Sequence, residues 1–151
     1  MIGIVFTSVV AASPEAVWAH ATTMRGVNDE LRPLVRMTAP RHGTIEDLPL
    51  GEVGFRSVLL AGGLVPFDVH FLRLEERSAG RFLERSHSLL QRRWEHERVV
   101  EPEPGGGTRV TDRLRIEPRL PGSAWLVRRM VAATFHHRHR RLARRFGGVA
   151  G

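Results

Sequence analysis

The chain begins with a segment in which apolar residues occupy every second position. This alternation over Ile2–Val10 is typical of a half-buried strand. Ser13-Pro14-Glu15 then has the composition of a helix start, with a capping serine, a proline at the first helical position and an acid in the first turn. We expect this helix to end near residues 25–26 and a second short helix to cover residues 27–31.

From residue 34 to residue 116 the apolar pattern keeps a period of two. Turns rich in glycine and proline interrupt it, including one at residues 40–43. Connections this short join antiparallel neighbours, so the pattern predicts an antiparallel sheet. Its further strands are expected at residues 34–39, 54–60, 67–75, 81–89, 92–100 and 108–117.

A long amphipathic helix is predicted at the end of the chain, over Ala124–Phe146, and glycines follow it. A helix of this length spans about 35 Å, enough to cover one face of a seven-stranded sheet. The order of elements therefore predicts a single α+β domain over residues 1–151. A curved antiparallel sheet wraps around the helix, and the two short helices close the pocket between them.

Composition narrows the possible functions. Hydrophobic residues make up 42% and charged residues 26% of the 151 residues, as in an ordinary soluble domain, and no apolar run is long enough to span a membrane. The sequence has no cysteine, which excludes disulfides, thiolate catalysis and cysteine-ligated metals. It has no lysine either, which excludes Schiff-base chemistry. With no secretory signal visible, we expect a cytoplasmic protein.

The net charge of +7 equals the number of arginines in residues 128–151, a segment that holds no acid. One interpretation is weak binding to an anionic membrane or nucleic acid; the other is a solvated helix face. The arginines concerned are Arg138, Arg140, Arg141, Arg144 and Arg145. His136-His137-x-His139 does not make a convincing metal site, because adjacent histidines diverge on a helix. We therefore expect no metal and no cofactor.

Four segments in the expected order resemble the SRPBCC superfamily, which includes START lipid-transfer domains and polyketide cyclases. They are Ser13-Pro14-Glu15-Ala16-Val17-Trp18, Trp94-Glu95-His96-Glu97, Gly105-Gly106-Gly107-Thr108-Arg109-Val110-Thr111-Asp112, and the run from Phe135 to Leu142. The resemblance implies a helix-grip fold with a cavity for a hydrophobic ligand between sheet and helix. It does not separate carriers from enzymes.

The last two strands can be paired if their hairpin centres on Pro104. Trp94 then lies opposite Leu114, and His96 lies opposite Asp112. Both pairs face the helix, because the alternate positions of these strands carry mostly charged residues. His96 with Asp112 allows three interpretations: a satisfied buried pair, a polar anchor for a ligand, or a catalytic acid–base pair.

Further residues are candidates for the cavity wall. On the fourth strand His70 shares a face with Leu72. On the fifth strand either Phe82, Glu84 and Ser86 or Leu83, Arg85, His87 and Leu89 face inward, and we favour the first set, which spares the cavity an arginine. Other candidates are Trp18, Met24, Trp125 and Met130, with Asn28 and Glu30 as gate residues at the mouth.

The sequence thus favours a protein, monomeric or homodimeric, that binds or carries a small hydrophobic molecule in an internal cavity. The alternatives are a cyclase or dehydratase that uses His96 and Asp112, and a module that associates with anionic surfaces through its C-terminal helix.

Overall fold

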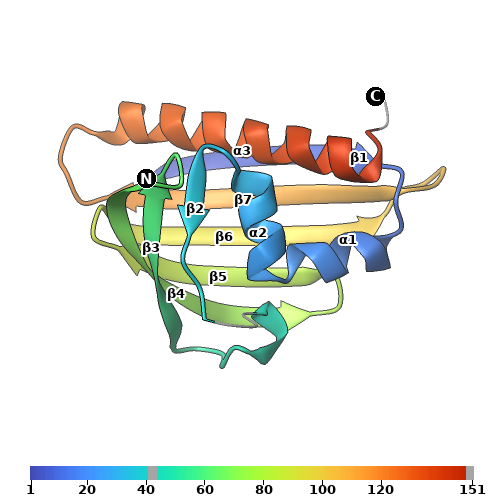
Figure 1. Ribbon diagram of the computed structural model, residues 1–151, viewed down its shortest axis with the longest axis horizontal. Helices are drawn as coiled ribbons and strands as arrows, with labels where there is room; N and C mark the ends of the chain where they lie inside the picture. Colours follow the sequence, from blue (N-terminus) through green and yellow to red (C-terminus); the bar gives the residue numbers. More distant parts are fainter. Residues whose placement is uncertain (41–43, 149–151) are drawn as a thin grey trace.

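One curved sheet with a long helix across it forms the protein (Figure 1). The computed structural model describes residues 1–40 and 44–148. In chain order the elements are β1 (Ile2–Val10), α1 (Pro14–Ala21), α2 (Met24–Leu31), β2 (Val35–Met37), the short 3₁₀ helix η1 (Ile45–Asp47), β3 (Val53–Ala61), β4 (Val65–Ser78), β5 (Arg81–Ser88), β6 (Gln91–Pro102), β7 (Thr108–Pro118) and α3 (Ala124–Phe146). The α+β helix-grip arrangement expected from the sequence is confirmed.

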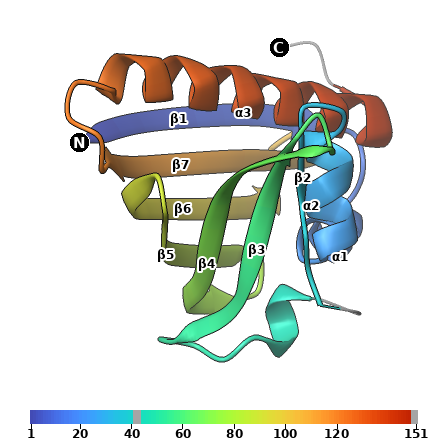
Figure 2. The same ribbon diagram turned by 60° about the vertical axis from the view of Figure 1, so that its left-hand side comes forward.

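The seven strands are antiparallel and follow the order β1-β7-β6-β5-β4-β3-β2. The long strand β4 is bent, with a register shift against β5 between Leu74 and Glu76. Beyond this bend, β3 and β4 run steeply across the direction of β1 and α3 (Figure 2). As a result, α3 packs mainly against β1, α2 and β7, at one side of the sheet.

The short helices differ from the prediction. The first ends at Ala21 rather than near residues 25–26, because the Thr22 hydroxyl donates to the Trp18 carbonyl and the Thr23 side chain caps α2. Gly26 lies inside α2, where an added Cβ would stand 1.8 Å from the carbonyl oxygen of His20. The strand β2 is shorter than expected and η1 was not predicted. The predicted turn at 40–43 lies mostly outside the described residues.

The register of the β6–β7 hairpin was predicted two residues away from the observed one. Trp94 pairs with Ile116, His96 with Leu114, and Arg98 with Asp112. The hairpin loop comprises residues 103–107, and three consecutive glycines with positive φ shift its centre away from Pro104. Because side chains alternate, a shift of two residues changes the partners but keeps the same face inward.

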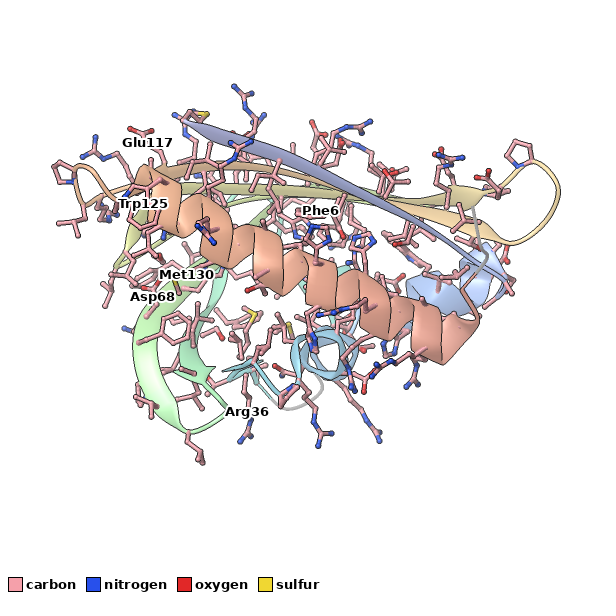
Figure 3. All side chains as sticks on the ribbon, turned by 90° about the horizontal axis from the view of Figure 1, so that it is seen from above. Phe6, Arg36, Asp68, Glu117, Trp125 and Met130 are labelled. Carbon is pink, nitrogen blue, oxygen red and sulfur yellow. The ribbon has the colours of Figure 1, made fainter. Side chains whose placement is uncertain are left out.

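One side of α3 supplies the helical part of the core. Val131 and Phe135 pack with Leu114 and Ile116 of the sheet, and Leu142 packs with a second group around Val110. Phe6 lies beneath α3, with its ring stacked at 5.8 Å on Phe135 (Figure 3). Among the described residues, none of the helices combines the length and the hydropathy that a membrane span requires.

Candidate functional site

Charged groups are buried on the inner face of the sheet, centred on Arg98, whose exposed fraction is 0%. Its guanidinium donates from Nε and Nη2 to the two oxygens of Asp112, and from Nη1 and Nη2 to those of Glu30, each at 2.8 Å. Glu30 also accepts a hydrogen bond of 3.1 Å from Arg138 Nε. The network therefore connects α2, β6, β7 and α3.

Glu30 is thus not the gate residue that the sequence predicted. It is 1% exposed and reaches inward because α2 packs against both the sheet and α3. Burial alone would raise the pKa of Glu30, but attraction to Arg98 and Arg138 outweighs it and lowers the pKa. The same balance holds the pKa of Asp112 well below, and that of Arg98 well above, the ordinary values. All three groups are therefore ionised in the folded protein.

The predicted contact between His96 and Asp112 is present, although the two residues are not directly opposite each other. His96 Nε2 donates to Asp112 Oδ1 and His139 Nε2 donates to Oδ2, each at 2.7 Å. With the two bonds from Arg98, Asp112 accepts four hydrogen bonds. On its other side, His139 accepts the Ser8 hydroxyl at Nδ1. Asp112 is saturated, so it orients the two imidazoles and stabilises the ion network.

A second polar cluster lies farther along the inner face and comprises His70, Glu84 and Ser86. The structure confirms that Glu84 and Ser86 face inward on β5. His70 Nε2 donates to Glu84 Oε2 at 2.5 Å, and the Ser86 hydroxyl donates to the same oxygen at 2.6 Å. His96 Nδ1 lies 3.9 Å from Glu84 Oε1 and Trp94 packs edge-on against His70, so the two clusters adjoin.

Three candidates near the short helices have local structural contacts. Trp18 packs against Phe82 and donates its indole N–H to Glu46 at 3.3 Å. Asn28 exchanges two hydrogen bonds with the backbone of Met37 and thereby holds α2 against β2. Met24 is buried beside them.

Of the remaining candidates for the cavity wall, two are buried and two are exposed to solvent. Leu72 and Leu114 are buried, and Leu114 lies in the core under α3 rather than on a cavity wall. Trp125 and Met130 of α3 are instead 64% and 57% exposed. Figure 3 shows Met130 on the side of α3 that faces β4 and Asp68.

Fewer arginines of the basic C-terminal segment are free to bind an anionic surface than the sequence suggested. Arg138 is buried in its ion pair with Glu30, so it cannot belong to a surface patch. Arg141 donates to the backbone and side chain of Asp29, and Arg145 lies 3.6 Å from the same carboxylate. Arg140 and Arg144 are exposed. Among residues 1–40 and 44–148 no group of three or more histidines and acids could hold a metal ion.

Two hollows lie on the side of the molecule formed by α2 and β2. The larger, of about 1070 Å³, is lined by residues that include His20, Arg25, Arg32, Arg36, Arg145 and Phe146. The smaller, of about 530 Å³, shares Arg25 and Arg36 with it and reaches Met24 and Met37. Within the described part of the chain, Arg25, Arg32 and Arg36 have no carboxylate partner.

Sequence reasoning did not single out Arg98 and His139 of the ion network, or the buried Ser57. Arg98 falls on the inward face by strand alternation alone, and an inward arginine requires acidic partners, which was a usable signal. His139 lies on the same helical stripe as Phe135 and Leu142. Ser57 gave no signal, because its buried position depends on the pairing of β3 with β4.

Comparison with solved structures shows the same fold in several bacterial proteins. Protein CV1439 from Chromobacterium violaceum has 14% sequence identity and a TM-score of 0.72, with 97% of this chain and 99% of that chain covered. A START superfamily protein from Mycobacterium smegmatis has 14% identity and a TM-score of 0.68, covering 95% and 96%. DynU16, from the dynemicin biosynthetic locus, has 15% identity and a TM-score of 0.59, covering 93% of this chain and 46% of that one.

Sequence comparisons are less informative about activity. Curated protein sequences give no match. The profile of the family described as "Domain of unknown function (DUF8410)" matches residues 8–146, which is most of the chain. The protein therefore belongs to the DUF8410 family, and its fold is of the SRPBCC type that the sequence resemblance predicted.

Proposed function

We propose that the protein binds a small hydrophobic molecule on the inner face of the sheet, beside the first half of α3. The observation that carries this proposal is the exposure of apolar side chains on that half of the helix. Trp125, Leu126 and Met130 are 64%, 47% and 57% exposed, whereas Val131, Phe135 and Leu142, on the side of α3 that packs on the core, are buried. Exposed apolar side chains grouped on one element favour a partner that removes them from water.

The curl of the sheet supports the same location. Among the described residues, α3 packs mainly on β1, α2 and β7, not on β3, β4 and β5. Leu59 of β3 and Trp94 of β6 point inward by register and are only half-buried. A ligand placed there would contact apolar groups on both the helix and the sheet. START-like proteins share this fold, which is compatible with ligand binding in general.

Acid–base catalysis by His96 and Asp112 is supported less well. Asp112 already accepts four hydrogen bonds and its pKa is held well below the ordinary value, so it has no capacity to take a proton at neutral pH. Asp112 can fix the orientation of His96, but the ion pair with Arg98 explains its burial without catalysis.

Titration with the uncharged dye Nile red tests the proposal. Met130→Glu places a charge against the ligand and is expected to weaken dye binding at least about tenfold. Val5→Glu is the matched control, because Val5 is also an exposed apolar residue but lies opposite Arg113 on the outer face of the sheet. Native mass spectrometry of freshly purified protein adds a search for a retained small molecule. Equal dye affinity in both variants would contradict the proposed location, and no binding at all would refute the function.

A second candidate function is association with an anionic lipid surface through the arginine-lined hollow. Four arginines, Arg25, Arg32, Arg36 and Arg145, surround it, and a hollow of about 1070 Å³ has room for a phosphate headgroup. Binding to phosphatidylglycerol vesicles is expected to fall steeply with added salt and to be lost in Arg32→Ala/Arg36→Ala. Arg56→Ala, on the outer face of β3, is the control. Binding of an oligonucleotide without vesicle binding would refute this candidate.

A further inference from the structure

We propose that the hydrophobic ligand carries a neutral hydroxyl group, which Ser57 and His70 hold on the inner face of the sheet. This inference rests on the proposed function and specifies its ligand. Ser57 is 0% exposed, and its hydroxyl has no hydrogen-bond partner among the described residues. Burying a hydroxyl without a hydrogen-bond partner destabilises a fold, so such a group calls for an explanation.

Strand pairing places Ser57 next to His70. The two residues are direct partners in the antiparallel pair β3–β4, so their side chains project from the same face. That face is the inner one, because His70 hydrogen-bonds to Glu84. Glu84 in turn lies beside His96, and the His96 ring packs edge-on against Phe135 of α3. Ser57 therefore points toward the space proposed for the ligand.

His70 is held in one orientation. Burial alone would raise the pKa of Glu84, but His70, His96 and Ser86 together lower it, so the side chain is an ionised carboxylate. This carboxylate takes the Nε2–H of His70, and Trp94 packs edge-on against the ring at 5.9 Å. Among the described residues Nδ1 makes no hydrogen bond. The imidazole is thus fixed by its far nitrogen, and the nitrogen nearer the backbone is left for another group.

The chemistry of the site selects the type of ligand group. A hydroxyl both donates and accepts, so it can pair with the Ser57 hydroxyl and with His70 Nδ1 together. An ether or a ketone only accepts. A carboxylate or phosphate would bring a second negative charge beside Glu84 and near Asp68, another buried acid on the inner face of β4. A phenol or an alcohol on an apolar skeleton fits these constraints best.

The test compares β-naphthol with naphthalene and with β-methoxynaphthalene by calorimetric titration. In the wild-type protein β-naphthol is expected to bind more tightly than either analogue. Ser57→Ala should reduce this preference by about five- to tenfold while leaving the affinity for naphthalene unchanged. The substitution breaks no hydrogen bond, so the thermal midpoint should stay the same or rise.

Ser88→Ala is the matched control. Ser88 is a buried serine opposite His70 on its other flank, in β5, and its hydroxyl accepts the backbone N–H of Gln91. Its loss should leave the preference for β-naphthol intact. If all three compounds bind equally and Ser57→Ala changes nothing, the inference is wrong while ligand binding stands. If none of the three compounds binds, the proposed function fails and this inference fails with it.

Discussion

The buried position of Glu30 leads to a quantitative prediction about stability. Glu30→Gln keeps the size of the side chain but removes the charge that accepts three hydrogen bonds, two from Arg98 and one from Arg138. Arg98 then keeps one carboxylate partner, Asp112, and the buried Arg138 loses the carboxylate that it contacts. Breaking a buried ion pair by removing one partner costs about 3–5 kcal/mol. This is a large share of the roughly 5–15 kcal/mol that stabilises a typical domain.

Equilibrium unfolding in urea, followed by circular dichroism, measures this loss. The midpoint should fall sharply while the slope with urea stays constant, because the folded and unfolded surfaces are unchanged. The matched control is Asp29→Asn, one position earlier on α2, where a partly exposed carboxylate pairs with Arg141 and Arg145. Its loss should cost at most about 1 kcal/mol. Equal effects of the two substitutions would refute the role assigned to the ion network.

Three further predictions concern pH, register and the hairpin loop. Folding lowers the pKa values of Glu30 and Asp112 from their ordinary values of 4.5 and 3.8, so in acid the unfolded chain binds more protons than the folded protein. The contribution of these groups to the free energy of unfolding should therefore be complete above those ordinary values and should decline as the pH falls below them. Urea midpoints across this range should show a weaker decline in Glu30→Gln, and an unchanged slope would contradict the assignment. Glu97 and Arg113 are direct partners in the β6–β7 pair, so the double variant Glu97→Cys with Arg113→Cys should form a disulfide in an oxidised sample. The double variant Glu97→Cys with Thr111→Cys should not form one, and the opposite result would disprove the register. Gly107→Ala would bring a Cβ to 2.3 Å from the Val10 carbonyl at a φ of +84°, so its thermal midpoint should fall further than that of Gly105→Ala, which has open space around it.

Alternation along the strands was the most reliable sequence signal for the site. It placed Trp94, His96 and Asp112 on the inner face even though the predicted register was two residues wrong, because such a shift preserves the face. The exact partners depended on the number of residues in the loop. A run of three glycines adopts many conformations, so the sequence did not determine that number.

Contacts between distant segments were not predictable in the same way. Glu30 meets Arg98 across 68 positions of sequence, and its burial depends on how α2 packs against α3. Periodicity correctly made α3 amphipathic, yet it did not show that Trp125, Leu126 and Met130 near the start of the helix would stay exposed. The strands β3 and β4 run steeply across the direction of α3, and α3 packs mainly on β1, α2 and β7 (Figure 2).

The buried ion network has a consequence for the inheritance of this sequence. An ancestor that replaced Arg98 alone would have removed the guanidinium that binds both Glu30 and Asp112, and one that replaced Glu30 alone would have removed a carboxylate from both Arg98 and Arg138. Either intermediate loses about 3–5 kcal/mol out of the roughly 5–15 kcal/mol that stabilises a typical domain, a loss that selection for stability disfavours. Descendant lineages are therefore expected to keep or exchange positions 30, 98, 112 and 138 as a group, so covariation among these four columns would record the network even where overall similarity has faded.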